Sequence, residues 1–277
     1  MKMYAEEIRD LDPWIEFITE INSDPRFANP TIATPEMYER KIIKAVDDPG
    51  DLVLGILQDG VQQGLFVFSI LKDDRYVEML AGLSRSREAY ETMAEYLLEH
   101  FPGFEADFVF NPANDLMTEL LKRKGAELDP EQQYMRLTGN PPAVDTKGIE
   151  LLSEPRREEY IALHNKDMYW TGDRIVEEPD FYRVFIALEN QRVVGYVDVS
   201  WPKQPNYICD LLVAEESRGK GWGKKLLAKA IEMNGSGGME LDVFTDNTPA
   251  LRLYESMGFT RVEGRNTVSA FWMIPEA

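Results

Sequence analysis

Cysteine and histidine are scarce in this chain, which has one cysteine and two histidines among 277 residues. A single cysteine, Cys209, cannot form a disulfide bond within the chain, which agrees with a reducing compartment. Cys209 lies in an apolar segment, and neither His100 nor His164 is near it in the sequence. We therefore interpret Cys209 as a small core residue rather than a nucleophile, and we expect no metal cofactor.

Long hydrophobic runs are also missing. No stretch of about 18 apolar residues occurs, so the sequence predicts no membrane-spanning helix. Residues 1–7 run straight into acidic side chains and lack the apolar core of a signal peptide. These absences predict a cytoplasmic protein, and a hydrophobic content of 44% is enough to build sizeable cores.

Positive charge is in short supply. Lys and Arg total 30 against 49 Asp and Glu, which gives a formal net charge of −19. The imbalance is concentrated in the first 140 residues, which hold 27 acidic and 14 basic side chains. This balance argues against nucleic acid or an anionic membrane as a partner. It is compatible with a cationic amine substrate, such as a polyamine, an aminoglycoside or a basic peptide, and equally with a solubilising acidic surface.

Glycine is concentrated where the sequence is most informative. Residues 218–223 read Arg-Gly-Lys-Gly-Trp-Gly, follow an apolar run at 208–213 and open into an amphipathic segment at 224–231. Glycines allow a ligand to approach the backbone closely, and the first turn of a helix offers unpaired N–H groups and a favourable dipole to an anion. The segment therefore predicts a pyrophosphate-binding turn, with Lys220, Lys224 and Lys225 as mobile positive charges. A solvated loop before a surface helix is the alternative.

The glycine spacing separates this loop from other phosphate-binding motifs. The dinucleotide fingerprint needs G-x-G-x-x-G, and the phosphate loop of nucleoside triphosphatases needs four residues between its glycines, so neither fits. The pattern R/Q-x-x-G-x-G/A does fit, with Arg218, Gly221 and Gly223 at its fixed positions. This pattern resembles the acyl-CoA-binding loop of the GNAT N-acyltransferase superfamily.

The sequence after the loop extends the resemblance. Asn247, Tyr254 and the pair Gly258-Phe259 follow an apolar run at 239–244, in the order expected of GNAT enzymes. Gly258 also suits the left-handed position that ends a helix. The resemblance covers most of the second half of the chain.

The resemblance implies a fold, an acyl donor and a set of site residues. The implied fold is α/β (α+β), with a mixed, mostly antiparallel twisted sheet flanked by helices, and the implied donor is acetyl-CoA. Tyr254 falls at the position of the general acid near the sulfur of coenzyme A, with a buried packing tyrosine as the alternative. A splayed strand at 211–213 would supply backbone N–H groups to the thioester. The implied cofactor-binding residues are Leu211, Leu212, Val213, Arg218, Gly219, Lys220, Gly221, Trp222, Gly223, Lys224 and Asn247.

The general base is less well specified. Asp210, in the strand before the loop, is the preferred candidate, and Asp198 in the preceding strand or an ordered water are the alternatives. We interpret His164 as a surface or packing residue.

Residues 166–180 fall where GNAT enzymes cover the acceptor pocket. The segment mixes aromatic and acidic side chains, among them Asp167 and Tyr169, a composition suited to an amine. We expect Trp170 and Glu177 to bind the acceptor. An exposed acidic loop is the alternative.

An internal repeat divides the chain. A shift of 133 residues superimposes Ser84-Arg85 on Ser217-Arg218, Asn114 on Asn247 and Gly125 on Gly258 without a gap. Upstream, residues 58–69 and 189–200 match as hairpins after a slip of two residues. We therefore predict two tandem GNAT-like domains, residues 1–140 and 145–277, joined by a linker near 138–143.

The first copy has lost the features that carry the chemistry. In the 133-residue register, the three loop glycines at 219, 221 and 223 are replaced by Ser86, Glu88 and Tyr90, and Tyr254 is replaced by Leu121. Side chains there would block the backbone, and Glu88 would repel a phosphate. We expect a degenerate first domain and a catalytic second domain, an arrangement similar to tandem GNAT members such as mycothiol synthase.

These features predict an N-acetyltransferase that moves an acetyl group from acetyl-CoA to a primary amine of a small molecule or peptide by direct attack. The alternative is a non-catalytic acyl-CoA-binding or regulatory protein that retains the fold. Tyr254 and the intact glycine loop favour the enzyme, because a binding protein needs no general acid. The fold itself does not specify the acceptor.

Overall fold

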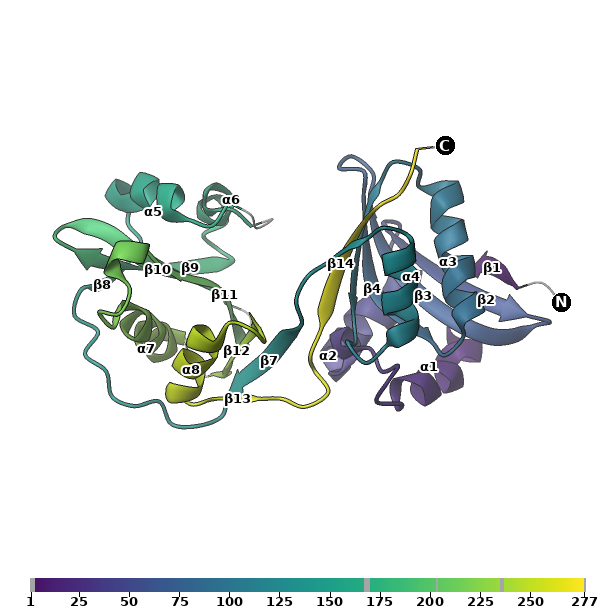
Figure 1. The fold of residues 1–277 in the computed structure, drawn as a ribbon, viewed down its shortest axis with the longest axis horizontal. Coiled ribbons are helices and arrows are strands. Elements are labelled where there is room, and N and C mark those ends of the chain that lie inside the picture. Colours follow the sequence, from purple (N-terminus) through teal and green to yellow (C-terminus); the bar gives the residue numbers. More distant parts are fainter. Residues whose placement is uncertain (1–2, 167–169, 203, 235–236, 277) are drawn as a thin grey trace. The chain divides into compact units, whose positions relative to one another are not determined.

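The computed structural model describes residues 3–166, 170–202, 204–234 and 237–276. The chain forms two compact units, the first made of Met1–Gln132 with Glu263–Ala277 and the second of Gln133–Val262. Each unit is built on a mixed seven-stranded sheet flanked by helices (Figure 1). The predicted fold class, two tandem units of mixed sheet and helices, is confirmed.

The first unit has the strand order β1-β2-β3-β4-β5-β14-β6. Its strands are β1 (Tyr4–Glu7), β2 (Asp51–Gln58), β3 (Val61–Leu71), β4 (Tyr76–Ser84), β5 (Glu105–Phe110), β6 (Glu127–Leu128) and β14 (Val268–Met273). Its helices are η1 (Asp12–Trp14), α1 (Ile15–Asn22), η2 (Pro30–Ile32), α2 (Pro35–Tyr38), η3 (Glu39–Ile43), η4 (Lys44–Val46), α3 (Arg87–His100) and α4 (Asp115–Arg123).

The second unit has the strand order β13-β7-β12-β11-β10-β9-β8. Its strands are β7 (Gln132–Leu137), β8 (Ile149–Leu151), β9 (Tyr182–Glu189), β10 (Arg192–Ser200), β11 (Asn206–Val213), β12 (Met239–Phe244) and β13 (Phe259–Arg261). Its helices are η5 (Glu154–Arg156), α5 (Arg157–Leu163), α6 (Gly172–Glu177), η6 (Glu215–Ser217), α7 (Trp222–Asn234) and α8 (Thr248–Ser256).

Two features common to both units support the internal repeat. Asn114 and Asn247 each cap a helix, accepting the N–H of Met117 and Ala250 over 3.2 Å. Each of these helices, α4 and α8, is followed by a glycine with positive φ, +78° at residue 125 and +92° at residue 258. The shift of 133 residues therefore holds over this stretch of both units.

The two sheets exchange one strand each. Strand β7, from the first half of the sequence, pairs with β13 in the second sheet, and β14, from the end of the chain, pairs with β5 and β6 in the first. The units therefore differ from the predicted domains at residues 133–140 and 263–277. Sequence similarity between two copies does not say which of two alike sheets a strand joins, so the pattern could not reveal this exchange.

The second sheet carries a different core on each face. One core packs against α7 and α8 and includes Phe185, Val197 and Leu241. The other lies under α5 and α6 and includes Val184, Ile186 and Tyr196, and Figure 1 shows these helix pairs on opposite faces. Alternate residues of β9 and β10 thus serve both cores. Asp198, two residues after Tyr196 on β10, therefore also lies on the α5–α6 face.

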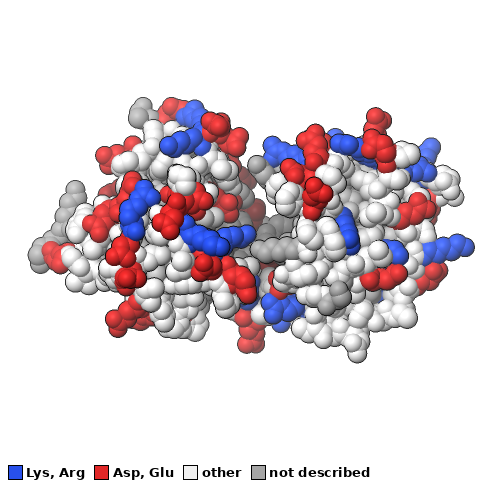
Figure 2. All heavy atoms as spheres, turned by 180° about the vertical axis from the view of Figure 1, so that it is seen from behind, with Lys and Arg blue, Asp and Glu red and all other residues white. Residues whose placement is uncertain are grey.

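Acidic side chains are spread over the visible surface rather than gathered into one patch (Figure 2). This distribution is what a solubilising charge produces. Within the described residues, no helix is long and apolar enough to cross a lipid bilayer.

The strand exchange predicts how a cut chain behaves. A protease site inserted between Pro142 and Ala143, in an exposed connection, would leave β7 on one fragment and β14 on the other. Because each strand is hydrogen-bonded in the sheet built mainly by the other fragment, we expect the cleaved protein to elute as one species by size-exclusion chromatography until denaturant is added. Two separate species in native buffer would contradict the exchange.

Candidate functional site

The two parallel strands at the centre of the second sheet part over most of their length. Strand β11 pairs with β12 only at Asn206↔Met239 and Tyr207↔Glu240, although the strands continue to Val213 and Phe244. Backbone groups that lose their sheet partner need another one. The edge of β11 beyond Tyr207 is therefore available to a ligand.

Alternation along β11 identifies the N–H groups on this edge. Ala214 donates its N–H to the Val194 carbonyl of β10 over 2.9 Å, and successive N–H groups of a strand point to opposite sides. Those of Leu211 and Val213 therefore face the side that β12 leaves, whereas that of Leu212 faces β10. The Leu211 N–H donates to Oδ1 of Asp210 over 2.9 Å.

The glycine loop connects β11 to α7. Gly219 and Gly221 have φ of +76° and +86°, a conformation that favours glycine, and no atom lies within 4 Å of a Cβ built at either residue. Gly223 is more confined, since its Cβ would lie 3.3 Å from Leu253 of α8 and 3.8 Å from Leu211. This packing brings the N-terminus of α7, the open edge of β11 and helix α8 together.

Several of the predicted cations already have partners. The Lys220 ammonium lies 2.8 Å from Glu189, which also accepts the Ser217 hydroxyl over 3.0 Å. These two donors hold the pKa of Glu189 below its usual value, Lys220 most strongly. The Nε of Arg218 donates to the Val213 carbonyl over 3.1 Å, and Lys225 donates to the Lys147 carbonyl over 3.1 Å. Trp222 begins α7 and Lys224 follows it within the first turn.

Helix α8 presents the predicted acid and amide. Asn247 is the N-cap, so its side-chain oxygen is used within the helix. Tyr254 is 7% exposed and packs against Phe259 with ring centroids 5.9 Å apart. Burial, with a smaller contribution from the Asp210 charge, raises the pKa of the Tyr254 phenol. The phenol therefore stays protonated, as a proton donor must.

Two carboxylates face each other on β10 and β11. Asp198 and Asp210 are register partners, and Tyr196 donates its hydroxyl to Asp210 over 2.5 Å. His164, expected at the surface or in simple packing, is instead buried with Nε2 2.9 Å from Asp198. The available signal was an aspartate inside an apolar strand, because such a residue requires a partner. Among the described residues, no group of three or more His, Cys, Asp or Glu could hold a metal ion.

The predicted acceptor segment is described in part. Asp167 and Tyr169 lie outside the described residues. Trp170 is 42% exposed, with its ring 5.4 Å from that of Tyr182, and Glu177 is exposed at the end of α6. A cavity of about 350 Å³ lies beside this segment. Its lining residues, which include neither Trp170 nor Glu177, are Leu151, Leu152, Ser153, Glu154, Arg157, Ile175, Val176, Pro179, Tyr182, Arg183, Val184 and Trp201.

The first unit lacks the glycine loop altogether. In the two sheets Gly64 pairs with Ser84 and Gly195 pairs with Val213, so Ser84 is the counterpart of Val213 rather than of Ser217. Only residues 85–86 connect β4 to α3, whereas residues 214–221 connect β11 to α7. The predicted alignment of Ser86, Glu88 and Tyr90 with the loop glycines is therefore wrong. Glu88 and Tyr90 lie on α3, because the loop is shortened and not merely substituted.

The first unit also fills the space where its parallel strands part. Strands β4 and β5 pair only as far as Met79↔Phe108, and η2 contacts both strands. Thr31 donates to the Leu80 carbonyl over 2.7 Å, and Asn111 of the β5 end donates to the carbonyls of Pro25 and Ala28. The chain itself thus occupies this edge.

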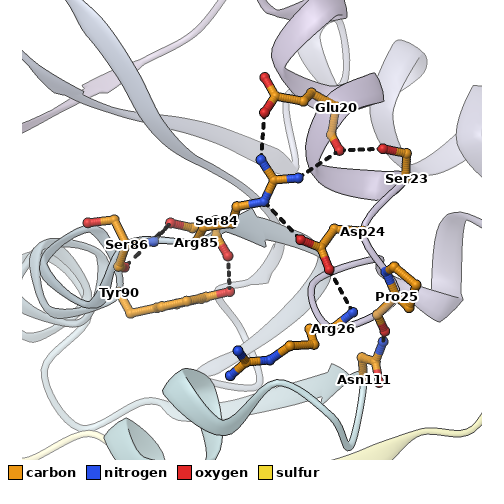
Figure 3. A network of polar contacts seen from close by, with 10 residues as sticks. All are labelled: Glu20, Ser23, Asp24, Pro25, Arg26, Ser84, Arg85, Ser86, Tyr90 and Asn111. Atoms are coloured by element: carbon orange, nitrogen blue, oxygen red, sulfur yellow. Dashed lines mark hydrogen bonds and ion pairs between the residues drawn. The ribbon is translucent and has the colours of Figure 1, made fainter.

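A network of polar contacts holds residues 20–26, which precede η2, in place (Figure 3). Arg85 pairs with Glu20 at 2.5 Å and with Asp24 at 3.1 Å. Tyr90 donates to the Ser84 carbonyl over 3.0 Å. The arginine beside the connection is therefore neutralised by its own unit.

Comparison with known proteins finds a family model that matches most of the second unit. Residues 149–259 match the model of the acetyltransferase (GNAT) family. The chain is 28% identical over 109 residues to the L-amino acid N-acetyltransferase AaaT of Escherichia coli, which covers 36% of this chain and 65% of AaaT. The chain spans 21 to 65% of the length of the curated relatives that it matches.

Solved structures resemble the whole chain. A GCN5-related N-acetyltransferase from Sphaerobacter thermophilus has a TM-score of 0.64 and 16% identity, with 99% of this chain and 97% of that chain covered. A tandem GNAT protein from the clavulanic acid biosynthesis pathway has a TM-score of 0.54 and 15% identity, with full coverage of both chains. At these identities the likeness concerns the fold, and it extends over both units. The comparison with mycothiol synthase stays a prediction.

Proposed function

We propose that this chain, a tandem protein whose residues 149–259 belong to the GNAT family, transfers an acetyl group from acetyl-CoA to a primary amine, with the second unit as the catalytic one. The observation that carries the proposal is the open edge of β11, the strand of Asp210, which leads directly into a positive-φ glycine loop. Through Gly223 this loop packs near α8, the helix that carries Tyr254. The similarity to an L-amino acid N-acetyltransferase supports an amine acceptor.

The donor would lie along the open edge of β11. The first-turn N–H groups of α7 and the loop at 218–223 would bind the pyrophosphate, because both offer donors without internal acceptors. The outward N–H group of Val213 would donate to the thioester carbonyl or the pantetheine arm, and so stabilise negative charge that develops on that oxygen. The N–H of Leu211 is donated to Oδ1 of Asp210, so Leu211 would border this path without donating to the donor substrate. Trp222, Gly223, Lys224 and Asn247 border this path.

The acceptor would reach the thioester from the α5–α6 face. Its neutral nitrogen attacks the carbonyl carbon, a C–N bond forms and the C–S bond breaks. Asp210 accepts the proton that the nitrogen loses, directly or through a water. Tyr254 gives its phenolic proton to the departing thiolate, and the proton held on Asp210 is released to solvent as Tyr254 is reprotonated. Asp198 is fully buried, which favours Asp210 over it as the group that meets the substrate.

A panel of primary amines with acetyl-CoA, followed by release of free thiol, tests the proposal. Amine-dependent thiol release supports an acetyltransferase. Saturable acetyl-CoA binding without turnover on any amine would instead support the alternative of a non-catalytic acyl-CoA-binding protein.

Gly221→Glu should abolish acetyl-CoA binding, measured by calorimetry. The substitution places a carboxylate where the pyrophosphate would lie and forces a side chain into a left-handed conformation, which costs about 1 kcal/mol or more. Gly60→Glu is the matched control, because Gly60 has a φ of +79° and equally open surroundings in the first unit. Stoichiometric binding by Gly221→Glu would refute this site.

Tyr254→Phe should lower kcat about 100-fold, in line with the contribution of a general acid, while acetyl-CoA affinity changes little. Tyr90→Phe removes an equally buried hydroxyl from the first unit and should leave turnover near that of the unaltered protein. If kcat of Tyr254→Phe is unchanged where the chemical step limits the rate, Tyr254 is a packing residue.

Trp170→Ala and Glu177→Ala should each raise KM for the amine several-fold and leave KM for acetyl-CoA unchanged, since cation–π and ionic contacts would act on the acceptor alone. Tyr4→Ala and Glu150→Ala remove a comparable exposed aromatic and an exposed acid elsewhere. If neither KM value changes in Trp170→Ala and Glu177→Ala, the acceptor pocket lies outside residues 166–180.

A further inference from the structure

Both oxygens of Asp210 are held by donors. Oδ2 accepts the Tyr196 hydroxyl over 2.5 Å and Oδ1 accepts the Leu211 N–H over 2.9 Å. The Tyr196 oxygen in turn accepts the N–H of Asn165 over 3.0 Å. The carboxylate is therefore fixed in direction on the face of the sheet that it shares with its register partner, Asp198.

His164 and Asp198 form a buried pair behind this carboxylate. Their side chains are 2% and 1% exposed. His164 Nδ1 lies 2.8 Å from the Asn165 carbonyl, which can only accept, and Nε2 lies 2.9 Å from Asp198. Tyr160 also donates to Asp198, 3.0 Å from either oxygen. With acceptors at both ring nitrogens, an imidazolium paired with a carboxylate satisfies every contact.

The aromatic rings around this pair favour a charged imidazole. The His164 ring stacks on Tyr196 with centroids 4.8 Å apart and planes 13° apart. Tyr160 meets both rings edge-on, at 5.3 Å and 5.2 Å. A cation over an aromatic face is stabilised by the ring quadrupole, so the stack connects the His164 charge to the residue that holds Asp210.

We propose that Tyr196 and the His164–Asp198 ion pair are positioning residues for Asp210, and that they leave Asp210 with an uncompensated negative charge that recognises a primary ammonium. The proposal rests on the proposed acetyl transfer. The pair contributes +1 and −1 and cancels, whereas Asp210 accepts only neutral donors. An anion held this way in a half-buried setting selects a cation as its ligand.

The direction of the His164 shift agrees with this assignment. Burial lowers the pKa of His164, but its hydrogen bonds to Asp198 and to the Asn165 carbonyl raise it by more, so the net shift is upward. Burial raises the pKa of Asp198 to about 6, and the hydrogen bonds from His164 and Tyr160 act in the opposite direction, in favour of the carboxylate. The other titratable groups that interact with the cluster are Tyr160 of α5, Asp173 of α6, Tyr182 of β9, Cys209 of β11 and, from the opposite face of the sheet, Tyr254 of α8.

The kinetic test removes the charge of the His164 side chain and largely keeps its size. His164→Gln leaves the Asp198 carboxylate without its cation and so adds an unbalanced negative charge beside the group that would take the amine proton. The acidic limb of the kcat/KM profile should therefore move up by about one pH unit. Adding Asp198→Asn removes the stray charge and should bring the limb back. A limb that stays in place in His164→Gln, or stays displaced in the double variant, would overturn the role of the pair.

Tyr196→Phe tests the direct contact with Asp210. Loss of the hydroxyl should lower kcat about 10-fold and move the same limb upward, with KM for acetyl-CoA unchanged. Tyr90→Phe is again the matched control from the first unit. An unmoved limb in Tyr196→Phe would show that the tyrosine only packs against His164.

A spectroscopic test does not depend on turnover. The chain has two histidines, so a protein labelled with ¹⁵N-histidine gives two imidazole patterns, and His100→Gln assigns them. We expect both ring nitrogens of His164 to be protonated at about pH 7.5 and the ring to become neutral in Asp198→Asn. A neutral His164 in the unaltered protein would refute the ion pair. If the ion pair is seen but no amine supports thiol release, the proposed acetyl transfer is what fails.

Discussion

The parting of two parallel strands is the constraint on which both units depend. Strand pairing between β11 and β12, and between β4 and β5, ends after a few residues, and the exposed backbone groups must find partners elsewhere. The first unit supplies them from its own chain, through η2 and the side chain of Thr31. The second unit leaves the Val213 N–H on an open edge, turns the Leu211 N–H to Oδ1 of Asp210, and adds a glycine loop beside this edge. One architecture thus serves as a closed scaffold in one unit and as a candidate binding site in the other.

The second unit combines this edge with a cluster of charged side chains on the face of the sheet that α5 and α6 cover. A buried carboxylate is costly unless it is paired, and Asp198 is paired with His164. In the proposed ion pair these two charges cancel, so the pair adds no net charge beside Asp210. The second unit therefore combines an open backbone edge on β11 with a carboxylate that two hydrogen bonds hold on the face of the same strand.

The sequence predicted the parts of this site that lie close together in the chain. Spacing within 218–223 and the positions of Asn247 and Gly258 carry local information, since turns and caps require particular residues. The alignment of Ser84 with Ser217 failed because the connection before α3 is shorter than the one before α7. The shift of 133 residues is correct for the asparagine and glycine at the two ends of α4 and α8, but it does not extend back across this shortened connection. The contact of His164 with Asp198 spans 34 residues and depends on how α5 packs on the sheet. No local pattern contains that packing, although an aspartate in an apolar strand signalled a missing partner.

The strand exchange is reciprocal, as it is between the subunits of a strand-swapped dimer. Strand β14 lies between β5 and β6 in one sheet, and β7 lies between β12 and β13 in the other, so each copy lends its seventh strand to its neighbour. A fusion of two genes whose products once traded that strand as a dimer has this topology. Each exchanged strand therefore belongs to one copy by sequence and to the sheet of the other copy by structure. A substitution in β7 is encoded with the first copy but acts on the sheet that carries the candidate site, and a substitution in β14 is encoded with the second copy and acts on the scaffold.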